Sequence, residues 1–199
     1  MRWTCVLDLL ALHGSTTPET RFISEEARMQ PFYYSPVIAL KPDIVSETCK
    51  RCTDGDPTVS FNFCMDTLSS IPKSHKSDLK GLALISVKLS MKNATQIKSQ
   101  VKELLKEAKT RDKYMKSCLE TCEELYSDAI AALRDSVKAI KAKRFDDALT
   151  YLSAVVDTPG TCEDGFSEGG IISPMMKENK IFFALSSMSL SISSLLAHY

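Results

Sequence analysis

The feature that most constrains how this chain folds is a pair of neighbouring helix-forming runs. One cysteine lies near the start of the first run, and another lies near the end of the segment. Between Leu119 and Phe166, apolar residues recur every three or four positions in two runs separated by a short polar link. They include Tyr126, Leu133 and Ile140 in the first run and Leu152 in the second. This spacing places the apolar residues of each run on one helical face. If the two helices are antiparallel, Cys122 and Cys162 come close. A disulfide between them closes a loop of about forty residues and stabilises the fold by roughly 3–4 kcal/mol.

Residues 77–197 contain four segments with helical periodicity, which predict a bundle. The expected helices cover, in chain order, residues 77–107, 112–142, 144–156 and the segment from 173 onward. Ser77 or Asp78 is expected to cap the first, Pro159 to end the third and Ser173 to cap the fourth. Short links between the helices predict an up-down-up-down arrangement. The serines between 186 and 194 are interpreted as a polar face that permits close packing.

An αα-hairpin is predicted ahead of the bundle, over residues 36–72. One helix is expected from Pro36 to about Lys50 and a second from Phe61 to Leu68, with a polar turn between them. Helices this short are marginal alone, so cysteines within the hairpin have a structural purpose. Residues 1–35 are a poorly defined leader, which starts like a secretory signal and continues as a polar, disordered-looking segment.

Composition and motifs exclude several classes of function. Lys plus Arg and Asp plus Glu number 25 each, so no net charge attracts nucleic acid. No apolar run of about 18 residues predicts a membrane span. His13, His75 and His198 lie apart from any nucleophile, phosphate-loop or metalloprotease motif and are interpreted as surface residues. We therefore expect no enzyme activity, no cofactor and neither a nucleic-acid nor a membrane partner.

Seven cysteines indicate an oxidising compartment outside the cytosol. The sequon Asn93-Ala94-Thr95 agrees with secretion and makes Asn93 a candidate glycosylation site. Cys49 and Cys52 form a C-x-x-C pair, but neither a nearby histidine nor a βαβ pattern completes a zinc or redox site. We expect one structural disulfide and one spare thiol from this pair, and no metal site.

Several stretches of the chain carry motifs that occur together in one family. They are ETCKRC and FCMDTLSSIP in the hairpin, SDLKGLALISVKLSMKNAT in the first bundle helix, and LETCEELYSDAI and RFDDALTYLSAVVDTPGTCEDGF after it. In this order, over roughly Pro36 to Leu196, they resemble the plant invertase and pectin methylesterase inhibitor family. The resemblance implies an all-α, disulfide-braced four-helix bundle behind an αα-hairpin. It also implies a secreted, apoplastic protein that inhibits a plant cell-wall enzyme.

The resemblance implies two disulfides, one within the hairpin and one clamping the bundle. The second maps to Cys122 and Cys162. The first includes Cys64, for which Cys49 is the favoured partner because it follows the Glu-Thr pair typical of the family. Cys52 remains a competing partner, since the threonine after it also fits the family pattern.

Two further cysteines, Cys5 and Cys118, are not assigned by the resemblance. Cys118 precedes Cys122 by one helical turn and shares its face, so a buried thiol is expected there. A bond between Cys118 and Cys52 is less favoured, because the hairpin and the start of the second bundle helix are expected at opposite ends of the bundle.

The resemblance also implies a one-to-one complex that covers the active-site cleft of the target, formed by a chain that is monomeric when free. Invertase inhibitors of the family carry Pro-Lys-Phe between the second and third bundle helices, where this chain has Lys143-Arg144-Phe145. Pectin methylesterase is therefore the favoured target, and acid invertase is the alternative. Because no catalytic domain follows Tyr199, a freestanding inhibitor is expected rather than the pro-region of an esterase.

Thr161 is the first candidate for partner binding, because it matches a family position that contacts the esterase. The other candidates are polar residues of the second and third bundle helices: Glu124, Asp128, Asp147 and Thr150. From spacing alone, such acidic residues form a solvated helix face, although charge of this kind also governs encounter with a partner. A non-inhibitory secreted bundle, such as a lipid carrier, is the alternative from a different class.

Overall fold

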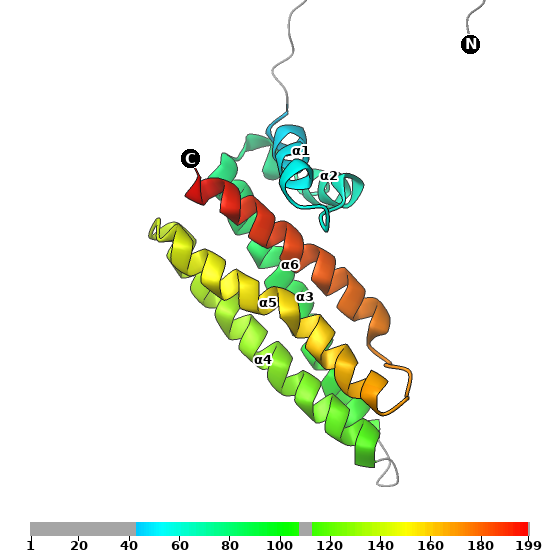
Figure 1. Cartoon of the computed structure of the whole chain (residues 1–199). Coiled ribbons are helices and arrows are strands. Elements are labelled where there is room, and N and C mark those ends of the chain that lie inside the picture. Colours follow the sequence, from blue (N-terminus) through cyan, green and yellow to red (C-terminus); the bar gives the residue numbers. More distant parts are fainter. Residues whose placement is uncertain (1–42, 108–112, 199) are drawn as a thin grey trace, which may run out of the picture. The chain divides into compact units, whose positions relative to one another are not determined.

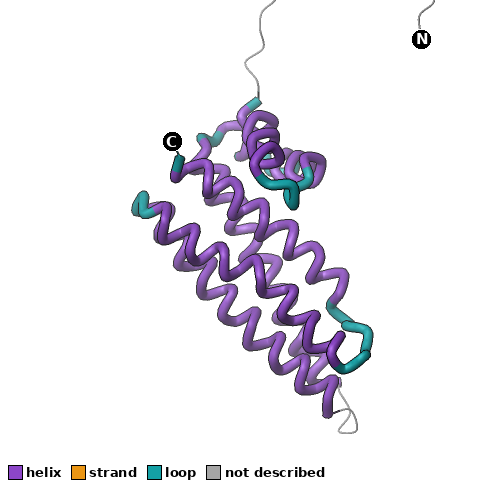
Figure 2. The backbone as a smooth tube through the Cα atoms, viewed as in Figure 1, coloured by secondary structure: helices purple, strands orange, loops and turns teal. Residues whose placement is uncertain are grey.

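The computed structural model describes residues 43–107 and 113–198. Two short helices come first, α1 (Ile44–Gly55) and α2 (Phe61–Ser69), followed by the 3-10 turn η1 (Ser74–Lys76). The long helices are α3 (Leu79–Glu107), α4 (Lys113–Lys141), α5 (Phe145–Glu168) and α6 (Met176–Ala197) (Figure 1). Neither described range contains a strand, and the predicted all-α fold is confirmed (Figure 2).

The four long helices form an antiparallel bundle with alternating directions, as predicted (Figure 2). α4 packs between α3 and α5, and α6 also packs against α3 and α5, so the four helices surround one core. The apolar seam predicted from periodicity lies in this core: Tyr126, Leu133 and Ile140 of α4 are fully buried, as is Leu152 of α5. Burial of these faces supplies the main driving force for folding.

The hairpin is closed by a Cys49–Cys64 disulfide, with the two Cα atoms 5.7 Å apart. Cys49 is therefore the partner of Cys64, as favoured from the sequence. Cys52 lies one turn further along α1 and faces the bundle, where its backbone carbonyl accepts a hydrogen bond from Ser191 of α6 at 3.5 Å. Burial raises the pKa of the Cys52 thiol, which keeps it protonated and unreactive.

The structure corrects the predicted end of the first hairpin helix. α1 continues to Gly55 instead of ending near Lys50, and residues 36–42, where we expected it to begin, lie outside the described residues. The hydroxyl of Thr53 bonds to carbonyls three and four residues earlier in the helix, so this residue extends α1 and does not begin a turn. The turn begins at Asp56, whose carboxylate accepts the Thr58 N–H at 2.9 Å.

α5 departs furthest from the sequence prediction. Pro159 does not end this helix, which continues to Glu168 and therefore includes Thr161 and Cys162. A proline inside a helix removes one backbone hydrogen bond and crowds the carbonyl four residues before it. Tertiary packing outweighs this cost, because a break here would expose Cys162 and Phe166, which are both buried. The link to α6 therefore begins after Glu168 and not directly after Pro159.

α4 and α5 end in the same backbone motif. The residue after each final turn has a positive φ, 61° at Lys143 and 65° at Gly170. At the end of α4, Arg144 donates its N–H to the carbonyl of Ala139 at 2.9 Å, and the same type of bond recurs after α5. These bonds satisfy carbonyls that a helix end leaves unpaired. Glycine adopts this conformation freely, whereas Lys143 bears a strain of roughly 1–2 kcal/mol.

The start of α6 also differs from the prediction. Ser173 does not cap the helix, which begins at Met176. Its hydroxyl instead accepts the N–H of Met175 at 3.0 Å and donates to the Glu163 carboxylate at 2.6 Å. Ser173 therefore holds the turn that leads into α6. At the start of α3, the predicted cap is confirmed at Asp78, which accepts the N–H of Gly81 at 2.7 Å.

The serines of α6 lie inside the bundle. Ser186, Ser187, Ser189, Ser191 and Ser193 are all buried. Ser189 shares a 2.9 Å hydroxyl–hydroxyl bond with Ser90 of α3, so these small side chains allow close packing, as predicted, but on a buried face. Among the described residues, α6 is the one helix long and apolar enough to cross a membrane by length and composition, and half of its most apolar window is buried in the bundle.

Replacing Cys122 and Cys162 together by serine is expected to lower the free energy of unfolding by about 3–4 kcal/mol, because the unfolded chain is then no longer closed into a loop. The matched pair Cys49→Ser and Cys64→Ser opens a shorter loop, of 15 residues, and is expected to cost about 3 kcal/mol. Urea unfolding followed by circular dichroism measures both changes. A protein without the first pair that is as stable as the wild type would contradict the role of that disulfide.

Candidate functional site

The Cys122–Cys162 disulfide joins α4 to α5 and confirms the predicted clamp. The two Cα atoms are 5.0 Å apart, and both side chains are buried. A covalent bond between these helices fixes the spacing of the side chains that flank it on the surface. We call this bond the clamp, and the surface of α4 and α5 beside it is the candidate site.

Two exposed polar stripes flank the clamp. One stripe lies on α4 and includes Ser117, Thr121, Glu124 and Asp128; the other lies on α5 and includes Asp157, Thr161 and Asp164. Within each stripe the residues recur at helical spacing, so they share one face. Thr121 and Thr161 line the same hollow of about 190 Å³ between the helices, where the two stripes meet.

The structure brings together three of the five residues predicted to bind a partner. Thr161 is exposed beside the clamp, and its hydroxyl donates to the Asp157 carbonyl at 3.1 Å, so its oxygen can still accept a hydrogen bond. Glu124 and Asp128 are exposed on α4, one turn apart. Their roles in binding remain predictions.

Asp147 and Thr150 lie apart from this group, near the start of α5. Thr150 is exposed but about three turns before Thr161, or roughly 16 Å along the helix axis. Asp147 is half-buried and pairs with Arg144 at 2.5 Å. If both residues also contact a partner, the contact surface extends along most of α5.

A buried polar network lies behind the clamp and was not predicted. Its centre is Asn179 of α6, whose side chain is 2% exposed. The Asn179 amide accepts a hydrogen bond from the Tyr126 hydroxyl and donates to the Glu163 carboxylate. It also lies 3.4 Å from the sulfur of Cys162. Because Ser173 donates to the same carboxylate, the network ties α4, α5 and the start of α6 together around the clamp.

Tyr126 is held as a protonated donor in this network. Burial, followed by the negative charges of Glu163 and Glu178, raises the pKa of its phenol. Its ring packs edge-on against Phe182, with 5.2 Å between ring centroids. Periodicity placed Tyr126 in the apolar seam but gave no sign of a hydrogen-bond partner. The residue in the sequence that could have indicated this partner is Asn179, a polar residue one helical turn before the buried Phe182.

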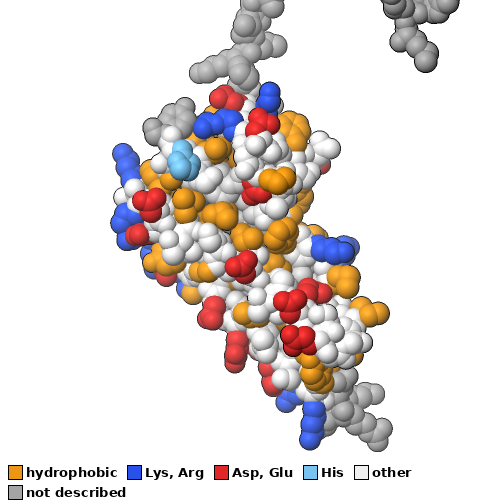
Figure 3. All heavy atoms as spheres, viewed as in Figure 1, with side chains coloured by type: hydrophobic (Ala, Val, Ile, Leu, Met, Phe, Trp, Pro, Cys, Tyr) orange, Lys and Arg blue, Asp and Glu red, His pale blue; other side chains and the backbone are white. Residues whose placement is uncertain are grey.

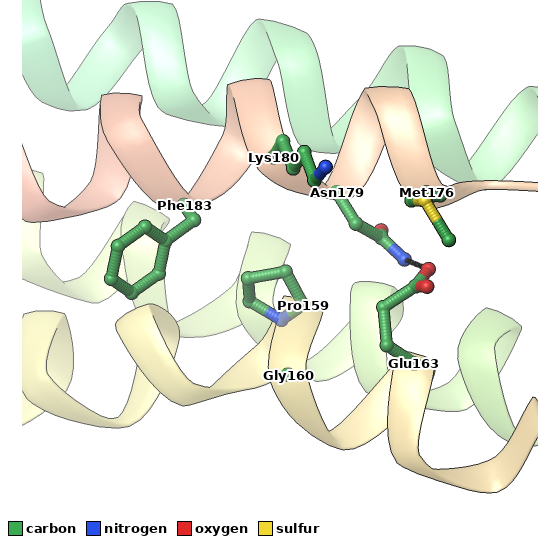
Figure 4. A pocket seen from close by; sticks show the side chains of 7 residues that line it. All are labelled: Pro159, Gly160, Glu163, Met176, Asn179, Lys180 and Phe183. Carbon is green, nitrogen blue, oxygen red and sulfur yellow. Dashed lines mark hydrogen bonds between the residues drawn. The ribbon is translucent and has the colours of Figure 1, made fainter. Parts of the chain in front are cut away.

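A second hollow, which we call the α5–α6 groove, has a volume of about 440 Å³ (Figure 4). It is lined by Pro159, Gly160 and Glu163 of α5 and by Met176, Asn179, Lys180 and Phe183 of α6. Met176 and Phe183 are 43% and 40% exposed. The sequence did not predict the groove because it depends on α5 continuing through Pro159.

No group of three or more His, Cys, Asp or Glu residues able to hold a metal occurs in residues 43–107 and 113–198. His75 pairs with Asp43 at 2.9 Å, His198 is exposed, and His13 lies outside the described residues. Asn93 is half-buried in the middle of α3, and its glycosylation remains a prediction.

Cys118 does not bond to Cys52. The Cys118 sulfur donates to the carbonyl of Gly165 in α5 at 3.2 Å, one turn of α4 before the clamp. α1, which carries Cys52, lies by the end of α6, whereas α4 begins at the opposite end of the bundle (Figure 1). The predicted buried position of Cys118 is confirmed.

The fold and the site define a class: a rigid helical bundle, clamped by disulfides, whose distinctive features lie on its outer surface. Comparison with known sequences agrees, because the sequence model of the plant invertase/pectin methylesterase inhibitor family matches residues 43–192. The chain belongs to this family. The family is one of proteinaceous inhibitors of invertase or pectin methylesterase, so the protein is an inhibitor-family protein and not an enzyme.

Individual relatives carry names from both branches of the family. A Platanus acerifolia protein named "Putative invertase inhibitor" is 36% identical over 170 residues, which cover 83% of this chain and 94% of the relative. An Actinidia deliciosa pectinesterase inhibitor is 30% identical over 138 residues, covering 69% and 70%. A solved structure of a mutant pectin methylesterase inhibitor from Arabidopsis has a TM-score of 0.64 at 20% identity, covering 76% of this chain and 95% of its own, and shares the fold.

Tyr126→Phe keeps the ring but leaves the Asn179 oxygen without its donor, and is expected to lower the free energy of unfolding by about 1–3 kcal/mol. Asn179→Leu, which removes the amide, is expected to cost a similar amount. The double variant should lose less than the sum of the two, because both replacements break the same bond. Thermal or urea unfolding of the four proteins measures the coupling. Strict additivity would show that the Tyr126–Asn179 bond contributes nothing.

The raised pKa of Tyr126 also predicts a dependence on pH. The unfolded chain releases this proton at a lower pH than the folded protein does. The stabilisation is therefore complete below about pH 10, the ordinary tyrosine range, and is lost as the pH rises above it. Urea unfolding between neutral pH and pH 11 is expected to show a smaller loss of stability for Tyr126→Phe than for the wild type. Equal losses would contradict the assignment.

Proposed function

We propose that the protein is a secreted inhibitor that binds one-to-one over the active-site cleft of a plant pectin methylesterase. The observation that carries this proposal is the clamp with its two exposed stripes: a covalently fixed, polar surface on neighbouring helices. A surface that is already ordered loses little conformational freedom when it docks. Affinity in such a complex comes from complementarity of shape and charge.

The charge of the stripes supports a role in encounter. Glu124 and Asp128 on α4, and Asp157 and Asp164 on α5, are exposed and carry one sign of charge beside the clamp. Exposed charges of one sign accelerate and orient the approach of a partner with the opposite sign, and salt screens this effect. We expect the esterase surface around the cleft to be basic where it meets these stripes.

The link between α4 and α5 supports pectin methylesterase as the target. The Pro-Lys-Phe pattern that we expect in invertase inhibitors would place proline at position 143. Lys143 has a φ of 61° and donates its N–H to the Ile140 carbonyl at 3.1 Å. Proline has a φ near −65° and no N–H, so the pattern is incompatible with this link. The chain therefore keeps the phenylalanine of that motif, at Phe145, but lacks its Pro-Lys pair, and its backbone at position 143 does not accept proline.

Acid invertase is the second candidate target. What favours it is the name of the Platanus acerifolia relative, which covers most of both chains. A titration of the protein against both enzymes in parallel separates the two candidate targets.

Secretion into the apoplast is part of the proposal and follows from the disulfides. Cys49–Cys64 and Cys122–Cys162 persist in an oxidising compartment. We assign the inhibitor domain to residues 36–197 and the leader to residues 1–35, which lie outside the described residues.

The purified, oxidised protein is expected to inhibit a plant pectin methylesterase with one-to-one stoichiometry and to leave an acid invertase active when both are titrated in parallel. Thr161→Arg is expected to weaken inhibition at least about tenfold, because a long charged side chain disrupts a packed contact. Inhibition of invertase alone would overturn the choice of target. Inhibition of neither enzyme would overturn the proposed function.

Thr95→Arg is a matched control for Thr161→Arg. Thr95 is an exposed threonine of α3, and its hydroxyl bonds to the carbonyl four residues earlier, as that of Thr161 does. Production in a bacterial periplasm forms disulfides but adds no glycan at the nearby sequon. The control is expected to inhibit like the wild type. An equal loss in both variants would contradict a specific contact at Thr161.

Lys143→Pro is expected to destabilise the protein by more than about 1 kcal/mol, because proline cannot adopt the observed φ or donate the hydrogen bond. Lys143→Gly is expected to stabilise it by up to about 1 kcal/mol, since glycine adopts this conformation without strain. Thermal unfolding measures both changes. A stable Lys143→Pro variant would contradict the argument that this link excludes the invertase-inhibitor motif.

A further inference from the structure

The end of the bundle that holds the α4–α5 link is rich in cations. The start of α3 lies here too, because the Lys80 ammonium donates to the carbonyl of Lys141, the last residue of α4, at 3.2 Å. α6 ends beside the link, since Ala197 lines the same hollow of about 320 Å³ as residues 143–147. Basic side chains are visible at this end of the bundle in the space-filling view (Figure 3). Six cations, which we call the basic end, gather here: Lys76, Lys80, Lys138, Lys141, Lys143 and Arg144.

Most of these cations are not neutralised within the chain. Within residues 43–107 and 113–198, four of them have no carboxylate at ion-pair distance: Lys76, Lys80, Lys141 and Lys143. The other two pair with Asp135 and Asp147. Of the other acids nearby in the sequence, Asp78 caps α3, and Asp146 is exposed. Cations without an acidic partner therefore outnumber the acids that remain at this end.

Helix stability accounts for only part of this charge. Lys138 and Lys141 lie in the last turn of α4, where the helix dipole favours cations. Lys76 and Lys80 instead flank the start of α3, where the dipole disfavours cations, and the first turn of α3 contains no acidic residue. Lys80 gains a hydrogen bond to a carbonyl of α4, but the exposed Lys76 ammonium has no such partner among the described residues. Its charge is available to a ligand.

Exposed lysines of this kind suit a polymer better than a small anion. A single exposed ion pair contributes little, so a free carboxylate or phosphate is held only weakly. A polymer that carries a carboxylate on each repeating unit meets several lysines at once and releases counterions when it binds. The lysine ammonium is a point charge on a flexible stem, so it can follow such a chain without a fixed geometry.

We propose that the basic end binds an acidic polysaccharide, a de-esterified polyuronate such as polygalacturonate. The choice of this polymer rests on the proposed function, because hydrolysis of the methyl esters of pectin leaves carboxylates along the sugar chain. Two disulfides, which persist in an oxidising compartment, favour a polysaccharide over a nucleic acid as the polyanion. Binding holds the inhibitor on the polymer that its target enzyme produces.

The basic end is remote from the acidic stripes beside the clamp. Lys141 follows Thr121 by twenty residues of α4, or roughly 30 Å along the helix axis. Glu124 and Asp128 lie in the first half of this helix, whereas Lys138 and Lys141 lie in its last turn. The acidic stripes repel a polyanion and the basic end attracts it. A polysaccharide at the basic end therefore leaves the stripes open to a protein partner.

Charge reversal at two exposed lysines tests the basic end. Lys76→Glu with Lys141→Glu reverses one cation before α3 and one at the end of α4. Lys76→Arg with Lys141→Arg keeps both charges. Lys177→Glu with Lys180→Glu is the matched control, because it makes the same change in net charge at two exposed lysines near the start of α6, at the other end of the bundle (Figure 1). Circular dichroism and thermal unfolding establish that each variant is folded.

Binding to polygalacturonate is measured by isothermal titration calorimetry without any enzyme, in about 0.1 M salt. The wild type is expected to bind this polymer at least about tenfold more tightly than a highly methyl-esterified pectin, and more weakly as the salt is raised. The Glu variant of the basic end is expected to lose at least about fivefold in affinity. The Arg variant and the control are expected to stay within about twofold, because charges roughly 25 Å away are screened at this salt concentration.

Three results would overturn the proposal. They are equal affinity for the esterified and the de-esterified polymer, an equal loss of affinity in the control and in the Glu variant of the basic end, and tighter binding to a single-stranded RNA than to polygalacturonate. A separate titration of a plant pectin methylesterase keeps this inference distinct from the proposed function. A wild type that inhibits the esterase but does not bind polygalacturonate overturns the polysaccharide site alone. A wild type that binds the polymer as expected but inhibits neither esterase nor invertase supports the site and overturns the proposed function.

Discussion

The bond between Cys122 and Cys162 connects the two sides of this molecule. On its inner side, the Cys162 sulfur lies beside Asn179, and the next residue, Glu163, receives hydrogen bonds from both Asn179 and Ser173. On its outer side, Thr161 is exposed at the meeting point of the two polar stripes. Side chains at the surface are therefore held in place by a covalent bond and by a buried polar network, and α5 contributes to them through the consecutive residues Cys162 and Glu163.

This arrangement suits inhibition better than catalysis. An inhibitor has to present an ordered surface and resist rearrangement, because freedom lost on docking subtracts from affinity. The described residues supply such a surface on α4 and α5, with the α5–α6 groove on the other flank of α5. Membership of the plant invertase/pectin methylesterase inhibitor family gives the same class of function. The central helix of this account is α5, since its residues contribute to the clamp, the stripe and the groove.

The sequence predicted whatever depended on periodicity or on cysteine spacing. Helical repeats located the bundle and the seam around Tyr126, and the motifs led to both disulfides. Prediction from the sequence failed where tertiary packing overrode a local helix-ending signal. Pro159 is a strong helix-ending signal, yet the burial of Cys162 and Phe166 carries α5 past it. The groove and the Asn179 network were not predicted for a related reason. Both form between helices, and local sequence patterns determine neither the exact lengths of these helices nor which of their residues face each other.

The most direct measurement is the inhibition constant of the oxidised protein beside that of a variant without the clamp, Cys122→Ser with Cys162→Ser, at a temperature where both are folded. The account predicts that the oxidised protein binds its enzyme one-to-one and that the variant, although folded, binds at least about tenfold more weakly, because its surface must be ordered on docking. A folded variant that inhibits as strongly as the clamped protein would contradict the account.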